Sequence, residues 1–170
     1  MSGRIGVALA IAGGLLAIAL VVRSGVAPPP LPVEHANLAY TLEDMAGGKI
    51  DLSKFAGKPL VINLWATWCG PCRLEMPQLE ELSVKFRDRG LTIIGISVDD
   101  APDAIRAAAA EYKITYPMLV GVGQDAFIRS IGYEDLLPMS VLIRADGTIA
   151  ERITGIKTTA DWQRRLLALF

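Results

Sequence analysis

The feature that most constrains the fold is an apolar segment that runs directly into a pair of cysteines. Residues 60–65 read LVINLW, residues 66–72 read ATWCGPC, and a helical pattern then continues to about residue 88, just before Gly90. A continuous apolar run of this length is typical of a strand that is buried on both faces of a sheet, and a glycine after a helical pattern marks the end of the helix. The sequence therefore predicts a central strand that ends at Trp65 and leads into a helix that begins at Cys69.

Strands and helices alternate in the rest of the chain. The further predicted elements are a β-hairpin around Gly47-Gly48 (residues 40–42 and 49–52), strands at 91–98 and 116–120, helices at 101–112 and 125–131, a hairpin at 140–144 and 148–153, and a helix at 161–170. The dipeptide Asp146-Gly147 between the last two strands is the strongest short signal for a hairpin. This alternation predicts an α/β domain with a mostly parallel sheet that helices cover on both sides.

The N-terminal segment is predicted to direct the chain to a membrane. Residues 5–22 are apolar and uncharged, and Arg4 and Arg23 flank them. As a helix this run would extend roughly 27 Å, close to the thickness of a bilayer core. A cleaved secretory signal is the alternative, although its apolar region is usually shorter, about 7–15 residues; Gly25 and Ala27 would offer small residues for cleavage. Residues 1–26 are thus expected to be an anchor or a signal, and in a bacterium either one exports the remainder of the chain.

A proline-rich linker and one domain are expected after this segment. Residues 27–34 read APPPLPVE, a composition that gives a semi-rigid, extended chain. Residues 35–170 are enough to bury a core without a stabilising disulfide. The net charge of −1 gives no sign of a nucleic-acid partner. The expected location is the bacterial inner membrane, crossed once, with this domain in the periplasm or on the outer face.

The cysteine pair suits redox chemistry better than metal binding. The chain has two cysteines and one histidine, His35, whereas a structural zinc site needs four ligands. The start of a helix carries partial positive charge that stabilises a thiolate, so Cys69 is the expected nucleophile. Cys72, one turn further on, would attack the mixed disulfide and release the product. Pro71 fits an early helical position, and no cofactor is needed for this exchange.

Residues 63–73, which read NLWATWCGPCR, resemble the active-site segment of the thioredoxin superfamily. The segments 52–59 (LSKFAGKP), 75–77 (EMP) and 137–143 (LPMSVLI) make the chain most similar to the membrane-anchored, extracytoplasmic TlpA/ResA-like branch, over about residues 40–170. The resemblance implies a thioredoxin-like central mixed sheet flanked by helices, with an N-terminal β-hairpin.

The resemblance also implies roles for particular residues. Pro138 matches a cis-proline that faces the cysteines, and the backbone of Leu137 would offer an edge to an extended substrate peptide. Glu75 would assist deprotonation of Cys72, although an acid near a helix start also has a simple electrostatic benefit. Asn63 stands where cytosolic thioredoxins have a buried acid, which makes Glu75 the better proton acceptor. The substrate-binding residues implied in this way are Trp68, Gly70, Pro71, Leu137 and Pro138.

The expected function is an exported thiol–disulfide oxidoreductase that reduces protein disulfides, with cytochrome c maturation as one setting. The Gly-Pro pair between the cysteines is that of thioredoxins, whose reduction potential is roughly −270 mV. Outside the cytoplasm such a protein needs a membrane electron donor. Two alternatives remain: a peroxiredoxin-type peroxidase, which needs a Pro/Thr-rich pocket with an arginine, and a copper-delivery module, which would use a wider cysteine spacing and a distant histidine.

One acidic pair has no function assigned by its sequence context. Asp99 and Asp100 follow the second buried strand, and Pro102 stands at an early position of the next helix. We expect this pair to lie near the rim of the site and to serve as a helix cap.

Overall fold

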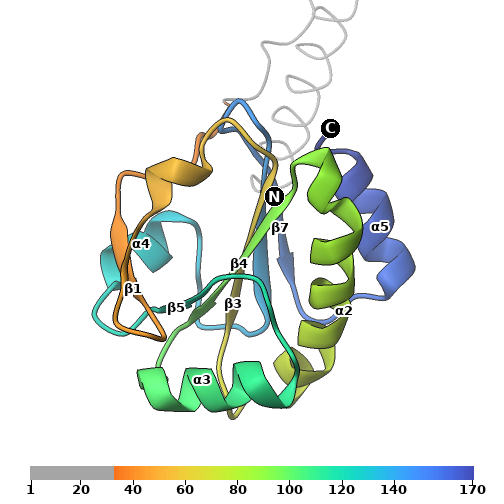
Figure 1. Ribbon diagram of the computed structural model, residues 1–170. Helices are drawn as coiled ribbons and strands as arrows, with labels where there is room; N and C mark the ends of the chain where they lie inside the picture. Colours follow the sequence, from red (N-terminus) through yellow and green to blue (C-terminus); the bar gives the residue numbers. More distant parts are fainter. Residues whose placement is uncertain (1–32) are drawn as a thin grey trace, which may run out of the picture. The chain divides into compact units, whose positions relative to one another are not determined.

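The computed structural model describes residues 33–170, and its elements follow the predicted order (Figure 1). In chain order they are β1 (Thr41–Asp44), β2 (Lys49–Asp51), the 3-10 helix η1 (Leu52–Phe55), β3 (Leu60–Trp65), α2 (Gly70–Phe86), the 3-10 helix η2 (Arg87–Arg89), β4 (Thr92–Ser97), α3 (Pro102–Glu111), β5 (Met118–Val120), α4 (Asp125–Ser130), β6 (Met139–Ile143), β7 (Ile149–Thr154) and α5 (Thr159–Leu167).

The sheet is mixed, in the order β2-β1-β5-β4-β3-β6-β7. Strand β4 runs parallel to both β3 and β5, whereas the pairs β1–β2, β1–β5, β3–β6 and β6–β7 are antiparallel. The mixed sheet implied by the family resemblance is therefore confirmed. The mostly parallel sheet predicted from alternation is wrong, because strands joined by short turns must run antiparallel, and such hairpins form both edges.

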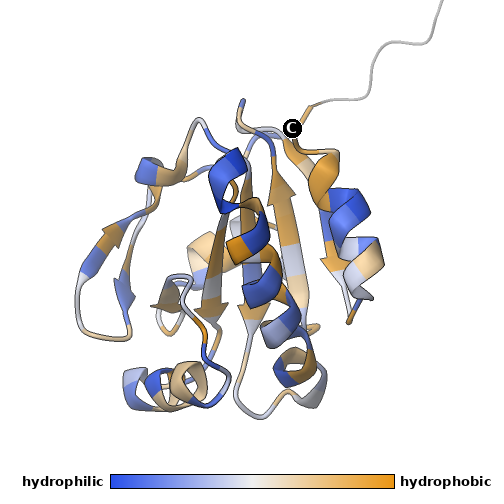
Figure 2. Ribbon diagram, turned by 45° about the vertical axis from the view of Figure 1, so that its right-hand side comes forward, coloured by the Kyte–Doolittle hydropathy of each residue, from blue (hydrophilic) through white to orange (hydrophobic). Residues whose placement is uncertain are grey.

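The two faces of the sheet carry separate apolar clusters. Side chains alternate along β3, so that Val61 and Trp65 pack with α2, α3 and α5, whereas Leu60, Ile62 and Leu64 pack with α4. Figure 2 shows the central strands coloured largely as hydrophobic and the exposed turns of the helices as hydrophilic. Because both faces are covered, all six residues of β3 are buried.

Asn63 is the polar exception within β3. Its position in the alternation places it on the same face as Val61 and Trp65, toward α2. A buried amide is costly unless its donors and acceptors are paired. Its partners lie at the end of the sheet where the cysteines are found.

The predicted anchor and most of the linker fall within residues 1–32, which lie outside the described part of the chain. Among residues 33–170, no helix has both the length and the apolar composition that crossing a membrane requires.

Candidate active site

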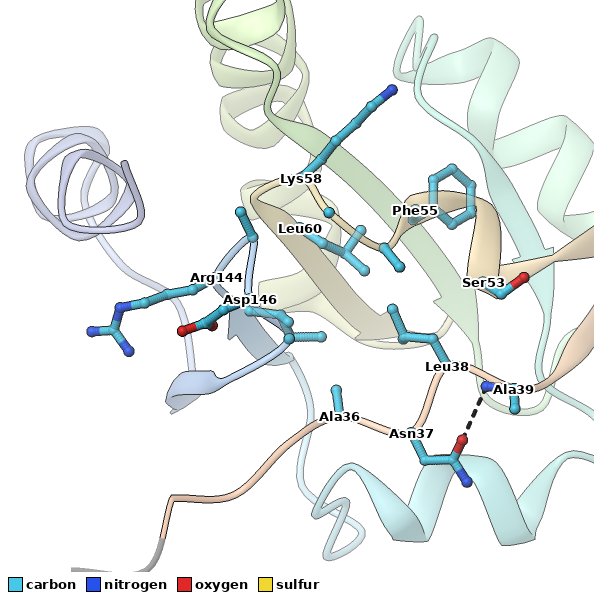
Figure 3. A pocket seen from close by; sticks show the side chains of 15 residues that line it. Ala36, Asn37, Leu38, Ala39, Ser53, Phe55, Lys58, Leu60, Arg144 and Asp146 are labelled. Carbon is cyan, nitrogen blue, oxygen red and sulfur yellow. Dashed lines mark hydrogen bonds between the residues drawn. The ribbon is translucent and has the colours of Figure 1, made fainter. Parts of the chain in front are cut away.

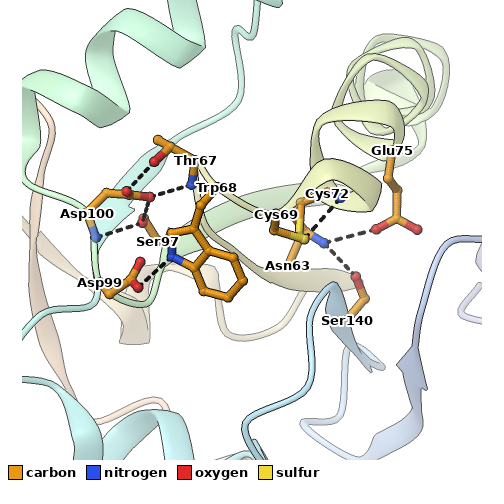
Figure 4. Close-up of a disulfide and its surroundings, with 10 residues drawn as sticks. All are labelled: Asn63, Thr67, Trp68, Cys69, Cys72, Glu75, Ser97, Asp99, Asp100 and Ser140. Carbon is orange, nitrogen blue, oxygen red and sulfur yellow. Dashed lines mark hydrogen bonds between the residues drawn. A yellow bond between two sulfur atoms is a disulfide. The ribbon is translucent and has the colours of Figure 1, made fainter.

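The cysteines lie where the chain leaves the carboxyl end of β3 and enters α2 (Figure 4). Cys69 is the N-cap of α2, and it is disulfide-bonded to Cys72 with a Cα–Cα distance of 5.3 Å. The Cys72 N–H donates to Cys69 Sγ at 3.2 Å, and the Cys69 N–H donates to the carbonyl of Ala66 at 3.1 Å. Pro71 stands in the first turn of α2, as predicted, where its missing N–H costs no helical hydrogen bond.

The surface around the pair is formed by the predicted neighbours. Cys69 is 4% exposed and Cys72 is 1% exposed, so both sulfur-bearing residues are largely covered. Trp68 is 64% exposed and Pro71 is also exposed. Cys69 is the slightly more accessible cysteine and lies at the positive end of the helix, which is the arrangement that favours a thiolate there.

Glu75 is a buried carboxyl on the same helix, three residues beyond Cys72. It is 2% exposed and accepts hydrogen bonds from Trp162 Nε1 at 3.2 Å and from Asn63 Nδ2 at 3.4 Å. Asn63 Nδ2 also donates to Ser140 Oγ at 3.0 Å, so the amide is paired as its burial demands.

Burial raises the pKa of Glu75 to about 6, because the charged form loses its hydration. Hydrogen bonds from Trp162, from the backbone at Lys157 and from Asn63 act in the opposite direction and stabilise the carboxylate. A carboxyl with such a pKa can hold or release a proton near neutral pH. Its position one turn after Cys72 suits proton exchange with that thiol, and this role stays a prediction.

Pro138 lies beside the end of β3, next to the loop that carries the cysteines. The Leu137–Pro138 peptide bond is cis, as the resemblance implied. The next residue, Met139, pairs with Leu64 in the register between β6 and β3. Leu137 is half-buried and packs against the apolar cluster that contains both cysteines. The structure thus brings Leu137 and Pro138 to the same end of the sheet as the cysteine pair.

The expectation that Asp99 and Asp100 cap a helix is wrong. The N-cap of α3 is Ala101, which makes no side-chain capping bond. Asp99 instead accepts a hydrogen bond from Trp68 Nε1 at 2.7 Å, and Asp100 bonds to Thr67. One signal was available in the sequence: parallel neighbours such as β3 and β4 end at the same edge of a sheet, so the residues after them meet.

Trp162 and Ser140 are the other site residues that the sequence did not reveal. Trp162 lies 87 residues from Glu75 in the chain, and a tryptophan in a C-terminal helix carries no signal for such a contact. Pro102 stands at the start of α3, as predicted.

His35 lies near the end of β3 that is opposite to the cysteines. His35 forms a bridge with Thr148, just before β7, and Ile149 of that strand pairs with Ile143. Ile143 in turn pairs with Leu60, at the amino end of β3. Six residues of strand separate that end from the cysteine end by roughly 17 Å. The copper-delivery alternative, whose histidine is distant in the sequence but must come close to the cysteines in space, therefore gains no support from this geometry.

A hollow of about 460 Å³ also lies at the amino end of β3 (Figure 3). Its lining includes Leu38, Phe55, Lys58, Leu60 and Arg144. It is distant from the redox pair and contains neither cysteine, so it is not the place where disulfide exchange occurs.

Comparison with known proteins agrees with this geometry. The family model described as Redoxin matches residues 33–165. Thiol-disulfide oxidoreductase ResA of Bacillus thuringiensis subsp. konkukian (strain 97-27) is 34% identical over 127 residues, which cover 75% of this chain and 72% of that protein. ResA of Geobacillus kaustophilus (strain HTA426) is 31% identical over the same shares of both chains.

Solved structures show the same fold. MTB dsbF superposes with a TM-score of 0.71 at 20% identity and covers 79% of this chain and 98% of its own. A thiol:disulfide interchange protein of the thioredoxin family from Chlorobium tepidum TLS gives a TM-score of 0.70 at 26% identity, over 85% and 97% of the two chains. Together with the cysteine pair at the start of α2, these findings show that the chain belongs to the redoxin family of the thioredoxin superfamily and is a thiol–disulfide oxidoreductase whose redox couple is Cys69 and Cys72.

Proposed function

We propose that this protein reduces disulfides of other proteins outside the cytoplasm, in the maturation of c-type cytochromes, and that residues 1–26 tether it to the membrane. The observation that carries the proposal is the redox pair itself: Cys69 at the N-cap of α2, with Gly-Pro before Cys72. That dipeptide is the one of thioredoxins, whose potential of roughly −270 mV makes them reductants. The relatives named ResA support the same class of activity.

The proposed exchange proceeds in two steps. In the reduced protein the Cys69 thiolate attacks one sulfur of a substrate disulfide, which forms a mixed disulfide and releases one substrate thiolate. Cys72 then loses its proton, to Glu75 in our proposal, and attacks Cys69 Sγ. This second attack releases the other substrate thiolate and forms the Cys69–Cys72 disulfide that the structure contains. Two electrons have passed to the substrate, and a membrane electron donor would return them.

The substrate would approach over the exposed surface of Trp68 and Pro71. The loop at Leu137 and Pro138 lies at the same end of the sheet and would present a backbone edge to an extended peptide around the reacting cysteine.

Trapping tests the identity of the substrate. A Cys72→Ala protein cannot complete the second step, so we expect it to accumulate mixed disulfides through Cys69 in cells, with apocytochromes c among the proteins that mass spectrometry identifies. The control is the Cys69→Ala/Cys72→Ala variant, which should trap none. A set of trapped proteins without apocytochromes would remove the cytochrome role while leaving the exchange chemistry in place.

The redox state in cells tests the direction. A reductant is kept reduced by its donor, so rapid acid quenching followed by alkylation should find most of the wild-type pair as thiols. A pair that is mostly disulfide, in cells whose substrates become more reduced when the protein is deleted, would make the protein an oxidant.

A further inference from the structure

The loop between β3 and α2 is held by a carboxylate from the next strand connection. Asp100 Oδ2 accepts the backbone N–H of Thr67 at 2.7 Å, and Oδ1 accepts the Thr67 hydroxyl at 2.5 Å (Figure 4). Ser97, the last residue of β4, donates its hydroxyl to Asp100 Oδ2 at 2.6 Å and accepts the Asp100 N–H at 3.2 Å. Asp100 is 8% exposed, so these contacts lie mostly away from water. We call this set of hydrogen bonds the Asp100 clamp.

The Asp100 clamp acts two residues before the nucleophile. In the oxidised protein the disulfide also ties Cys69 to the first turn of α2. That covalent tie is absent whenever Cys69 is a thiolate or is bonded to a substrate. In those states the loop is held by non-covalent bonds: the clamp on Thr67, the hydrogen bonds from Cys69 N–H to Ala66 and from Trp68 Nε1 to Asp99, and the bond that the Arg73 N–H donates to the Cys69 carbonyl.

We propose that Asp100 is a positioning residue for disulfide exchange, which fixes Thr67 so that the Cys69 sulfur keeps its place when the disulfide is open. Exchange requires the attacking sulfur to approach its target in line. Small displacements of a reacting group are known to lower rates strongly. Asp100 acts through Thr67, by the bonds from its backbone N–H and its hydroxyl together.

Trp68, which bonds to the neighbouring Asp99, provides a fluorescence signal that reports the motion of the loop. Asp99 bonds to the indole of Trp68, which is 64% exposed, whereas Trp65 and Trp162 are fully buried. A small polar quencher such as acrylamide therefore reaches mainly Trp68, and its effect reports how freely the loop moves.

A second clamp of the same chemistry supplies a matched control. Glu80 accepts the backbone N–H of Thr115 at 2.7 Å and the Thr115 hydroxyl at 2.5 Å. Glu80 follows Gly70 by ten residues, which is roughly 15 Å along α2 from the cysteine end. Valine at either threonine keeps the shape of the side chain, removes the hydroxyl bond and leaves the backbone bond.

The experiment compares Thr67→Val with Thr115→Val in the full-length protein, reduced beforehand and mixed with oxidised glutathione. We expect Thr67→Val to lower the second-order rate constant of exchange about tenfold and to increase quenching of Trp68, more in the reduced than in the oxidised form. Thr115→Val should change neither quantity. Thr67→Ser, which keeps the hydroxyl, should restore the wild-type rate. Asp100→Asn, which keeps one acceptor oxygen, should fall between wild type and Thr67→Val.

Three results would overturn the proposal: a wild-type rate in Thr67→Val, an equal loss of rate in Thr115→Val, or a Thr67→Ser protein as slow as Thr67→Val. The assay needs no physiological partner, so its outcome is independent of whether the cytochrome role proposed above is correct.

Discussion

The two cysteines differ in their place on α2, and this difference should decide their reactivity. Their exposures of 4% and 1% are too close to separate them by access alone. Cys69 caps the helix, where the partial positive charge lowers the pKa of a thiol. In the reduced protein at about pH 6, iodoacetamide should therefore label Cys69 several-fold faster than Cys72, as peptide mass spectrometry can measure. Faster labelling of Cys72 would reverse the assigned roles.

Glu75 should link both stability and catalysis to pH. Its pKa of about 6 in the folded protein lies above the ordinary value of 4.5, so the folded state holds the proton more tightly than the unfolded state. The stabilisation is complete below about pH 4.5 and is lost as the pH rises through about 6. A raised pKa of this size corresponds to about 2 kcal/mol of unfolding free energy.

Glu75→Gln should remove that pH dependence. Urea unfolding at about pH 4.5 and pH 7.5 is expected to give a smaller difference for the variant than for the wild type. If Glu75 also receives the proton of Cys72, the variant should show a clear shift in the pH profile of disulfide exchange. Its change in unfolding free energy alone would not account for that shift. A mere electrostatic partner of the helix would change stability by about 0.3–1 kcal/mol and leave the exchange profile in place.

The site residues that spacing revealed are those whose chemistry is local, whereas Leu137 and Pro138 were predicted only through the family resemblance. Cys69, Pro71 and Glu75 share one helix start, and their spacing alone predicts that they meet. Trp162 and Asp100 reach the site through tertiary packing and through the shared edge of parallel strands. A single sequence without that topology does not predict their contacts.

At the scale of the elements, α5 supports the site through its contact with α2. Trp162 is fully buried and donates to Glu75, a bond that lowers the pKa of that carboxyl. Trp162→Phe should therefore raise the pKa of Glu75 further and destabilise the fold by about 1–3 kcal/mol. The pH profile of the exchange rate should therefore move to higher pH in this variant.

A packing variant on the same helix separates the two effects of Trp162→Phe. Leu166 is also fully buried but has no bond to Glu75. Leu166→Ala should cost about 2–5 kcal/mol and leave the pH profile where it is. If both variants shifted the profile alike, the hydrogen bond from Trp162 would have no specific role.

Element identity was predictable where hydrophobic patterning is strong, as for β3 and α2. The 3-10 helix η1 (Leu52–Phe55) was not predicted. Asp51 caps it by accepting the Ser53 N–H, and the same side-chain bond also forms in simple turns, so the sequence does not distinguish the two. Strand direction was less predictable than strand existence. Alternation of strands and helices suits parallel pairing, but the short connections β1–β2 and β6–β7 override it at both edges of the sheet.

At the scale of the whole molecule, the described residues contain a complete core. The redoxin match covers residues 33–165, and two apolar clusters cover the two faces of one sheet between residues 33 and 170. The fold could be predicted because a short motif of known placement, the cysteine pair, sits between a buried strand and a helix. We expect a fragment of residues 33–170 to unfold cooperatively in urea and to reduce insulin disulfides at the rate of the full chain.

The role of residues 1–26 can be separated from that intact core. A tether would hold the enzyme at the membrane surface beside its electron donor, where a short linker gives a high effective concentration. A secreted form of residues 33–170 should then exchange disulfides normally in solution, yet restore cytochrome c maturation to a deletion strain only when overproduced. A fusion of the same fragment to an unrelated single-pass anchor should restore it at ordinary levels. If the full-length protein is found in the soluble periplasmic fraction with a new N-terminus near Pro28, residues 1–26 are a cleaved signal, and proximity to the membrane plays no part in how this enzyme meets its donor.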